Sequence, residues 1–559
     1  MALPTATTAW PPRHLQPAFN SFATCQVWWH GDALELSSTH GEPARTGLGG
    51  IVDKVKRLFW GTKPDASSQI RQIHIPVAAD IVQTAASLLL PDPVSFAAAD
   101  DDELANDLAR KRIDKILNSP QTHAGMLRAA ETCSALGGTF GRIVWNKDVC
   151  DHAWIDWVDA DQAVPEFVYG RLSAVTFWSV VDENEEKNEV VRHLERHESG
   201  YTEFHSDGTS TPVFARIYHG LYQGTATTLG HPIGLAAHPD TAGIVLTGDG
   251  YVDTGVAALT AWYVPNAMPN PAFRGRSTLR HFGRSDIGDP AVIGLMDQID
   301  ETYSSLARDV RLAKARLIVS DFLLEVGGPG KGSSFNTEQE VYERVGGVPN
   351  AGNPVLEAHQ FDIRVDDHLR TGEGFLRAIL RRVGFSPYSF GLSDEGAAMT
   401  ATEVDSKKDA STSTFKARSG IWKSVLATAA RTLIEVDAAV FETGATLGQD
   451  LVVTWPPAAR ESMLSKGQTL QAIATALAAS TEWKVRYLNP TYDDTQVAEE
   501  VARILKENAM AAAVDPFAVG ADQPPSGAEF QAIDEGQADD NPLDDDLVDE
   551  DQDELVLTE

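Results

Sequence analysis

Apolar residues recur every three or four positions over two stretches in the second half of the chain, a spacing that indicates helices with one buried face. The first stretch opens at Asp289, an N-cap residue, with proline at the first helical position. Its apolar positions are Val292, Leu295, Ile299, Tyr303, Leu306, Val310, Ala313 and Leu317. The second stretch, His368–Val383, carries Phe375, Ile379 and Val383 on one stripe. The pattern predicts two helices.

Residues 400–442 predict a much longer helix, about 60 Å at 1.5 Å per residue. Thr400 and Glu403 form a T-x-x-E capping box at its start. Its first half, Asp405–Thr414, is almost free of apolar residues, so we expect it to lie against a neighbouring subunit, solvent or an aqueous channel. Its second half has an apolar face made of Trp422, Val425, Leu426, Ala429, Leu433, Val436 and Val440.

The remaining pattern divides into an arm, a helical region, a β-rich region and a helical end. Residues 1–50 are rich in Pro, Gly and Thr and predict an arm with at most one short helix. Further helices are predicted at Val52–Trp60, Val77–Leu90, Asp100–Asn118, His123–Leu136, Ser465–Ala479 and Thr491–Asn508. Strands are predicted at Gly141–Trp145, Ala174–Val181, Glu189–Glu198, Phe214–Tyr222, 317–326, 341–345, 360–365 and Leu451–Trp455, with loops over Gly224–Gly250.

Three motifs invite a chemical interpretation. The acidic run Asp100–Glu103 fits a helix N-terminus better than a metal site, because it complements the helix dipole. The sequence RHLERHE places His193, Glu195 and His197 on one strand face, where they are either weak metal candidates or part of a hydrated outer face. The sequence GGPGKGSS, residues 327–334, lacks the Gly and Ser/Thr of a phosphate-binding loop, so a mobile loop is expected.

Composition narrows the compartment and the partners. Of the net charge of −34, the tail from residue 515 onward carries −16 and has no Lys or Arg, which leaves −18 for the body. That body is too acidic to grip nucleic acid by counterion release, and residues 511–559 are expected to be disordered. Three cysteines without a CxxC pair argue for a reducing compartment. Neither a signal peptide nor a membrane span is expected.

Several stretches carry a resemblance to the portal proteins of tailed bacteriophages, of the type found in long-tailed phages of Gram-positive hosts. They are HIPVAADIVQTAASLLLPD, LGGTFGRIVWNKDV, DADQAVPEF, FGLSDEGAAMTATEV and LNPTYDDTQVAEEVARIL, within about residues 50–510. The helix–clip–helix–loop–long-helix order of residues 289–443 is also similar to that family. Each stretch alone is weak, whereas their order and spacing together are specific.

The resemblance implies an α+β fold with the division of a portal subunit. The expected parts are an arm (1–50), a wing (51–288, helical then β-rich), stem helix 1 (289–318), a clip (319–364), stem helix 2 (365–385), a tunnel loop (386–399), a long helix with a return strand (400–460), a crown (461–510) and an acidic tail (511–559). The resemblance also implies that Ser389, Gly391, Ser393, Asp394, Glu395 and Gly396 line a DNA channel. In the clip it implies that Gly328, Lys331 and Ser333 dock partners.

The function that the resemblance implies is structural. Twelve copies would form a ring at one capsid vertex, through which double-stranded DNA is packaged and ejected without sequence specificity. The implied partners are a terminase motor, a head–tail adaptor, the major capsid protein and a scaffolding protein, and the location is the virion, after synthesis in the host bacterial cytoplasm. No catalytic, cofactor or metal residues are expected. The alternatives are another head–tail connector or capsid protein, or a soluble acidic hydrolase.

The arginines of the two stem helices leave three possibilities open. Arg308, Arg311, Lys314 and Arg316 crowd the end of the first helix, and Arg370, Arg377, Arg381 and Arg382 lie on the second. They could form a solvated basic face, a belt that touches DNA, or a contact with the acidic surface of a neighbouring subunit. In a ring, the apolar stripe of the first helix could also pack on copies of itself.

Overall fold

The structure is a computed structural model with two compact units, Met1–Arg460 and Glu461–Glu559. It describes residues 3–4, 8–32, 36, 73–204, 210–312, 316–319, 325–326, 333–334, 356–359, 363–392, 401–456, 463–476, 478–489, 492 and 494–514. Helices and sheets are mixed, which confirms the α+β class. The helix predicted at Val52–Trp60, the strand at 341–345 and the acidic tail from residue 515 lie outside the described residues.

Four helices form the helical part of the first unit: α1 (Gln16–His30), α4 (Val77–Leu89), α5 (Asp107–Ile116) and α6 (Pro120–Leu136). The predictions at 77–90 and 123–136 are confirmed. Ser119 caps α6 by accepting the N–H of Thr122, and Pro120 follows at the first helical position. Within the predicted arm, α1 is a full 15-residue helix that buries Phe22, Cys25 and Trp28.

The acidic run Asp100–Glu103 does not start a helix, so that prediction is wrong. Helix α5 begins at Asp107, and Asn106 caps it by accepting the N–H of Ala109 at 2.8 Å. The buried Asp102 carboxylate instead accepts the N–H groups of Gly448 (2.9 Å) and Gln449 (3.0 Å), which follow the long helix. Those donors lie far along the sequence, and no local pattern could show them.

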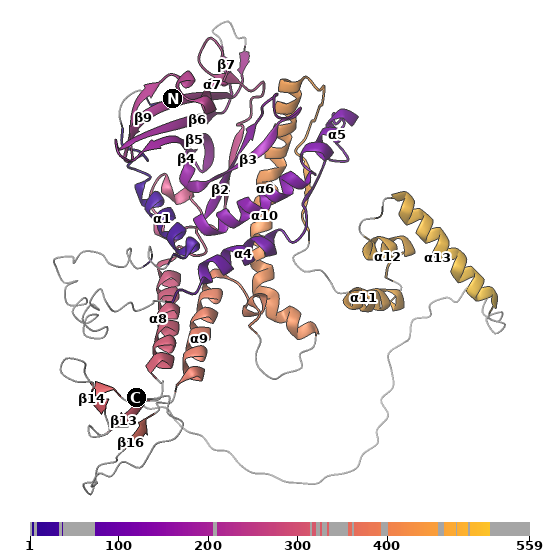
Figure 1. Ribbon diagram of the computed structural model, residues 1–559. Coiled ribbons are helices and arrows are strands. Elements are labelled where there is room, and N and C mark those ends of the chain that lie inside the picture. The colour runs from indigo at the N-terminus through magenta and orange to yellow at the C-terminus, as the bar shows by residue number, and fades with distance from the viewer. Residues whose placement is uncertain are drawn as a thin grey trace, which may run out of the picture. The chain divides into compact units, whose positions relative to one another are not determined.

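Two antiparallel sheets form the β-rich part (Figure 1). The smaller has the order β12-β2-β3 and joins Ala261–Pro265, Gly138–Val144 and Trp154–Asp159. The larger has the order β10-β9-β6-β5-β4 and joins Thr228–Ile233, Arg216–Thr225, Glu189–Glu198, Arg171–Asn184 and Ala163–Val168. Strand β11 (Val252–Asp253) also pairs with β9. All four strands predicted in this region are present.

The stretch Gly224–Gly250, predicted to be loops, contains strand β10 and a short helix, α7 (Pro239–Ala242). Strand β10 exists because it pairs with the edge of β9, a tertiary contact that its own composition does not signal. Two short hairpin-like pairs complete the sheets: β7 (Tyr201–Phe204) with β8 (Ser210–Val213), and β1 (Ser95–Ala97) with β17 (Val452–Thr454). Strand β17 confirms the return strand predicted at 451–455.

The two predicted stem helices are present as α8 (Pro290–Leu312) and α9 (Val365–Val383), which lie side by side (Figure 1). Strand β13 (Arg316–Val319) contains Leu317, so the first helix ends earlier than predicted. The strand predicted at 360–365 is also misplaced. Strand β16 (Leu356–His359) precedes that range, where it pairs with β13, and Val365 already begins α9. Strands β14 (Glu325–Val326) and β15 (Ser333–Ser334) form a further pair.

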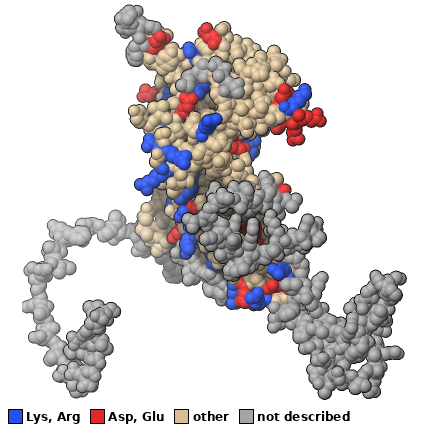
Figure 2. All heavy atoms as spheres, turned by 90° about the vertical axis from the view of Figure 1, so that its left-hand side faces the viewer, with Lys and Arg blue, Asp and Glu red and all other residues tan. Residues whose placement is uncertain are grey.

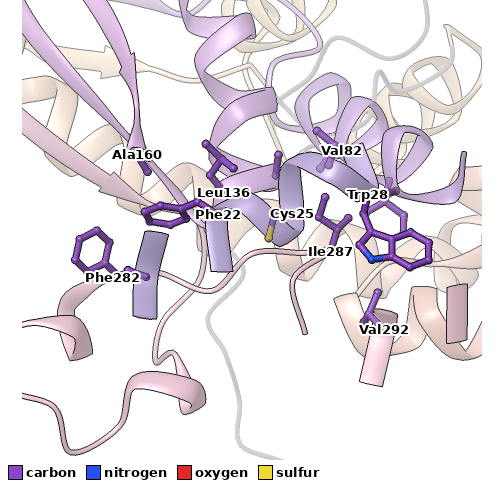
Figure 3. Close-up of a cluster of buried hydrophobic side chains, with 14 of the residues drawn as sticks. Phe22, Cys25, Trp28, Val82, Leu136, Ala160, Phe282, Ile287 and Val292 are labelled. Atoms are coloured by element: carbon purple, nitrogen blue, oxygen red, sulfur yellow. The ribbon is translucent and has the colours of Figure 1, made fainter. Parts of the chain in front are cut away.

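The long helix is α10 (Ala401–Phe441), and its apolar half lies in one of two main hydrophobic clusters. There Trp422 contacts Trp157 and Trp455, with ring centroids 5.4 and 6.2 Å apart. The other cluster joins α1, α4 and the start of α8 (Figure 3). The capping box at Thr400 and Glu403 concerns side chains outside the described residues.

The apolar stripe of α8 is largely used inside its own subunit. Val292, Met296 and Ile299 are 1–2% exposed and share a cluster with Ile379 and Val383 of α9. The idea that this stripe packs on other copies is therefore wrong for its first half. Any contact between copies through the hairpin must use the outward faces of α8 and α9.

The second unit contains α11 (Met463–Thr475), α12 (Thr481–Leu488) and α13 (Asp494–Val514). Two of these helices were predicted, whereas α12 was not. Its short sequence TEWKVRYL gives too few turns for periodicity, although Ser480 caps it by accepting the N–H of Trp483. None of the described helices in either unit is long and apolar enough to cross a membrane.

Candidate functional site

The base of the α8–α9 hairpin meets the polar half of α10, and we call this junction the hairpin root. It consists of residues 286–289 before and at the start of α8, residues 382–390 at the end of α9 and beyond, and residues 411–418 of α10. The short helix η6 (Pro387–Phe390) belongs to it. The root joins the three segments that the portal resemblance assigns to stem, tunnel loop and long helix.

A buried ion pair forms the centre of the hairpin root. The Arg418 guanidinium donates to both oxygens of Asp286 at 2.7 and 2.8 Å, and the two residues are only 5–6% exposed. Ser134 (2.6 Å) and Asn266 (3.0 Å) donate to the same carboxylate. Because every oxygen of Asp286 has partners, the charge tolerates burial and fixes α10 against both the wing and the start of α8.

Arg418 also lies over the ring of Phe385, with its guanidinium carbon 5.2 Å from the ring centroid. Phe385 follows the end of α9 and is itself buried. One side chain of α10 therefore contacts the segments at both ends of the hairpin. A cation over an aromatic face adds a favourable electrostatic contact at this point.

Two further polar residues of α10 hold the segment after α9. Ser411 Oγ accepts the N–H of Ser386 at 2.8 Å and lies 2.8 Å from Ser389 Oγ. Thr414 Oγ1 donates to the carbonyl of Gly384 at 2.7 Å. Together with Arg418 these residues occupy positions i, i+3 and i+7, so they lie on one face of the helix. We call them the polar stripe of α10.

The polar stripe corrects part of the prediction for the long helix. The first half was expected to find no place in its own subunit, yet Ser411 is 5% exposed. Asp409, Ala410, Ser413, Lys416 and Ala417 are exposed, as expected. The difference arises because the loop after α9 supplies backbone groups that need hydrogen-bond partners, and hydroxyl side chains satisfy them.

A second ion pair fastens the two helices of the hairpin to each other. Arg382 donates to Asp289 Oδ2 from Nε (3.0 Å) and Nη2 (2.7 Å), while Asp289 Oδ1 accepts the N–H of Ala291 as the cap of α8. Partial burial would raise the pKa of Asp289. The hydrogen bonds from Ala291 and Arg382 outweigh that effect and hold its pKa below the ordinary value.

The structure describes only part of the predicted tunnel loop. Ser389 lies in η6 and is turned toward Ser411, and Gly391 ends η6 with a φ of 75°, a left-handed conformation that favours glycine. Ser393, Asp394, Glu395 and Gly396 lie outside the described residues. In the predicted clip, Ser333 pairs with Val326 in β14–β15, while Gly328 and Lys331 are also outside them.

The histidine motif of β6 lies in a buried polar layer. Glu195 accepts a hydrogen bond from Arg142 (2.8 Å) and lies 2.7 Å from His197, whose other ring nitrogen contacts Thr260 at 2.7 Å. Burial would raise the pKa of Glu195, but Arg142 and His197 hold it well below its ordinary value. His197 is fully buried, so the interpretation as a hydrated outer face is wrong.

The third member of that motif, His193, contacts His219 at 3.1 Å and borders a small polar cavity of about 190 Å³. Arg142, Asp156 and Glu195 also line the cavity. Within the described part of the chain, no group of three or more His, Cys, Asp or Glu side chains is arranged to hold a metal ion. The arrangement is that of a charge network between two sheets.

Sequence reasoning missed Asp286, Arg418 and Ser411, the residues that build the hairpin root. A signal was present, because Ser411, Thr414 and Arg418 are polar residues at heptad spacing within a helix otherwise expected to face outward. Their partners could not be foreseen, since Asp286 lies 132 residues before Arg418 in the chain.

Comparisons with known proteins give one weak similarity. No protein-family model matches the chain, and no curated protein does. A solved structure described as the "Neck of empty GTA particle computed with C6 symmetry" is similar over 82% of this chain and 98% of its own, with a TM-score of 0.37 and 14% identity. At this TM-score the similarity is too weak to support a function, which must be argued from the chain's own residues.

Proposed function

We propose that this chain is the portal subunit of a tailed phage or phage-like particle. Copies of it would form a ring of twelve at one vertex of the capsid, with an axial channel for double-stranded DNA. Its role is structural, and the energy for packaging would come from a separate terminase motor. The other partners would be a head–tail adaptor, the major capsid protein and a scaffolding protein.

The observation that carries this proposal is the hairpin root. The portal resemblance requires a helical hairpin, a loop and a long helix in that order, and all three segments meet through Asp286, Arg418 and Ser411. A single buried ion pair and three hydroxyl contacts transmit a displacement of the loop to the hairpin and the long helix. Such a coupling suits a duct whose loop meets moving DNA.

The acidic loop residues fit the same proposal. DNA carries one negative charge per about 1.7 Å of its axis, so a basic lining would bind it and slow its passage. Asp394 and Glu395 would instead repel the duplex and keep it centred. Glycines Gly391 and Gly396 would serve as hinges, and Gly328, Lys331 and Ser333 would belong to the surface that docks the motor or adaptor.

Electron microscopy of the purified full chain tests the proposal. Rings with a central hole about as wide as a DNA duplex are expected at micromolar concentration. A folded chain that stays monomeric across concentration and salt would overturn the portal assignment. In a packaging reaction, Asp394→Lys combined with Glu395→Lys should leave rings intact but reduce packaging, most strongly at low ionic strength.

A further inference from the structure

The outward faces of the α8–α9 hairpin remain available for another molecule. Tyr303 of α8 contacts Gly372 of α9, where an added Cβ would lie 3.0 Å from the ring. Two residues along a helix correspond to about 200° of rotation. Glu301 therefore lies on the side of α8 away from α9, and Gly374 lies on the side of α9 away from α8. Residues Ile73–Ile75 cover a third side of α8 by bonding to Asp300 and Ser304.

The outward face of α9 is basic. Arg370 and Arg381 are exposed, and in the described part of the chain neither forms an ion pair. Arg377 lies between them and pairs with Glu373 on its own helix at 2.7 Å. Arg377 and Arg381 are four residues apart, a spacing at which like charges destabilise a helix. Gly374 lies on the same face, with no atom within 4 Å of an added Cβ.

The outward face of α8 carries the opposite sign. Asp297 and Glu301 are also four residues apart and repel each other. Burial raises the pKa of Glu301, and the neighbouring Asp297 raises it further. Gly294 lies on this face with open space around its added Cβ, and Gln298 is exposed. Each helix thus contains a like-charge pair that a partner of opposite sign would relieve.

The two charged faces lie at the same height along the hairpin. Three contacts set the register: Asp289 with Arg382, Tyr303 with Gly372, and Asp309 with His368. By this register Glu301 lies level with Gly374, within about 6 Å of Arg370 along the axis, and Asp297 lies within about 7 Å of Arg381. Rotation about an axis parallel to the hairpin preserves these heights.

We propose that the basic outward face of α9 in one copy packs against the acidic outward face of α8 in the next copy, head to tail around a ring. The inference rests on the proposed function and names the surfaces that close the ring. A head-to-tail contact needs two different, complementary surfaces on opposite sides of one subunit, and the hairpin provides them. Glycines at the centre of both faces allow the helices to approach closely.

DNA is the competing occupant of the basic face, and the hairpin itself favours a second copy. The net charge of the hairpin's outward surfaces alternates between its two sides, which complements another copy of the chain. A face made for DNA would leave Asp297 and Glu301 repelling each other with no partner. Figure 2 shows acidic and basic groups interspersed on one face of the molecule, not gathered into a single field of positive charge.

Charge reversal of the full-length chain tests the contact. One variant carries Asp297→Lys and Glu301→Lys, and the other carries Arg370→Glu and Arg381→Glu, which leaves the Arg377–Glu373 pair in place. Each variant alone should stay monomeric at concentrations at which the unmodified chain forms rings, a loss of about tenfold or more in association per contact. An equimolar mixture should assemble again into rings of alternating copies, and so should a chain with all four changes.

Mass photometry and electron microscopy measure assembly, and circular dichroism checks that each variant is folded. Rescue in the mixture cannot come from improved folding, so it supports the contact specifically. If the unmodified chain forms rings and both variants form them equally well, the contact is wrong while the portal function stands. If the arginine variant assembles normally but binds a fluorescent DNA duplex at least tenfold more weakly, the basic face belongs to DNA. Failure of the unmodified chain to form rings would count against the proposed function itself.

Discussion

The two halves of helix α10 are held by different kinds of contact. The second half, from Trp422 to Val440, is surrounded by apolar side chains of the wing, including three other tryptophans. The first half is held at three points by the polar stripe, Ser411, Thr414 and Arg418. Apolar packing is non-directional and is lost only by creating a cavity. Hydrogen bonds are directional and can be exchanged one at a time.

This difference suits the places to which the halves are attached. The apolar half is part of the wing, whose sheets form a fixed frame. The polar half is attached to the loop after α9, which the portal function requires to move against DNA. We infer that one continuous helix combines a rigid anchor with an adjustable contact, and four measurements can test that division.

The largest effect should come from the anchor. Trp422→Ala removes a fully buried ring from between Trp157 and Trp455 and should lower the free energy of unfolding by about 3–5 kcal/mol. Urea denaturation of the first unit measures it. The neighbouring Lys423→Ala, an exposed position, is the matched control and should change stability by less than about 0.5 kcal/mol. Equal effects would show that the apolar half is not the anchor.

The next largest effect should come from the centre of the hairpin root. Arg418→Met leaves the Asp286 carboxylate buried without its cation and should cost about 3 kcal/mol. Adding Asp286→Leu to that variant should recover part of the loss, because the unpaired charge is then gone. Thermal unfolding of both single variants and the double variant gives the coupling between the two residues. Additive losses would contradict the ion pair as the source of the effect.

A smaller and local effect is expected from Ser411→Ala, about 1–2 kcal/mol for the unsatisfied N–H of Ser386. Hydrogen exchange should speed up at Ser386 and Ser389 while exchange around Trp422 stays unchanged. Ser413→Ala, at an exposed site two residues away, is the control. If protection fell equally throughout α10, the two halves would not be independent.

The smallest effect is a pH dependence at the base of the hairpin. The pKa of Asp289 is lowered in the folded state, so its contribution is present above the pKa of the unfolded chain and disappears as the pH falls through the lower folded value. Acidification below about pH 4 should therefore loosen the junction of α8 and α9 before the apolar half of α10. Asp289→Asn should abolish that first step when hydrogen exchange is followed between pH 5 and 3. A step of unchanged size would assign it to another carboxylate.

The strong periodic patterns identified the helices correctly. Helices α4, α6, α8, α9 and α10 followed from three-to-four spacing, from proline at a first helical position or from glycine at an end, because these signals act within a few residues. The errors occurred where a distant partner decides the outcome. Asp102 serves a turn more than three hundred residues away, strand β10 needs the edge of β9, and β16 is placed by β13.

The sequence by itself determined which segments are helical, which face of α10 is apolar, and that the middle of the chain is β-rich, since each depends on local propensity and on the repeat of apolar positions. Only the tertiary structure decided that His193, Glu195 and His197 are buried and that Ser411, Thr414 and Arg418 hold the loop. It also decided that the apolar stripe of α8 is covered by its own subunit. The physical reason is that burial and hydrogen-bond partners depend on which segments meet in space, and a linear pattern of polarity contains no record of those pairings.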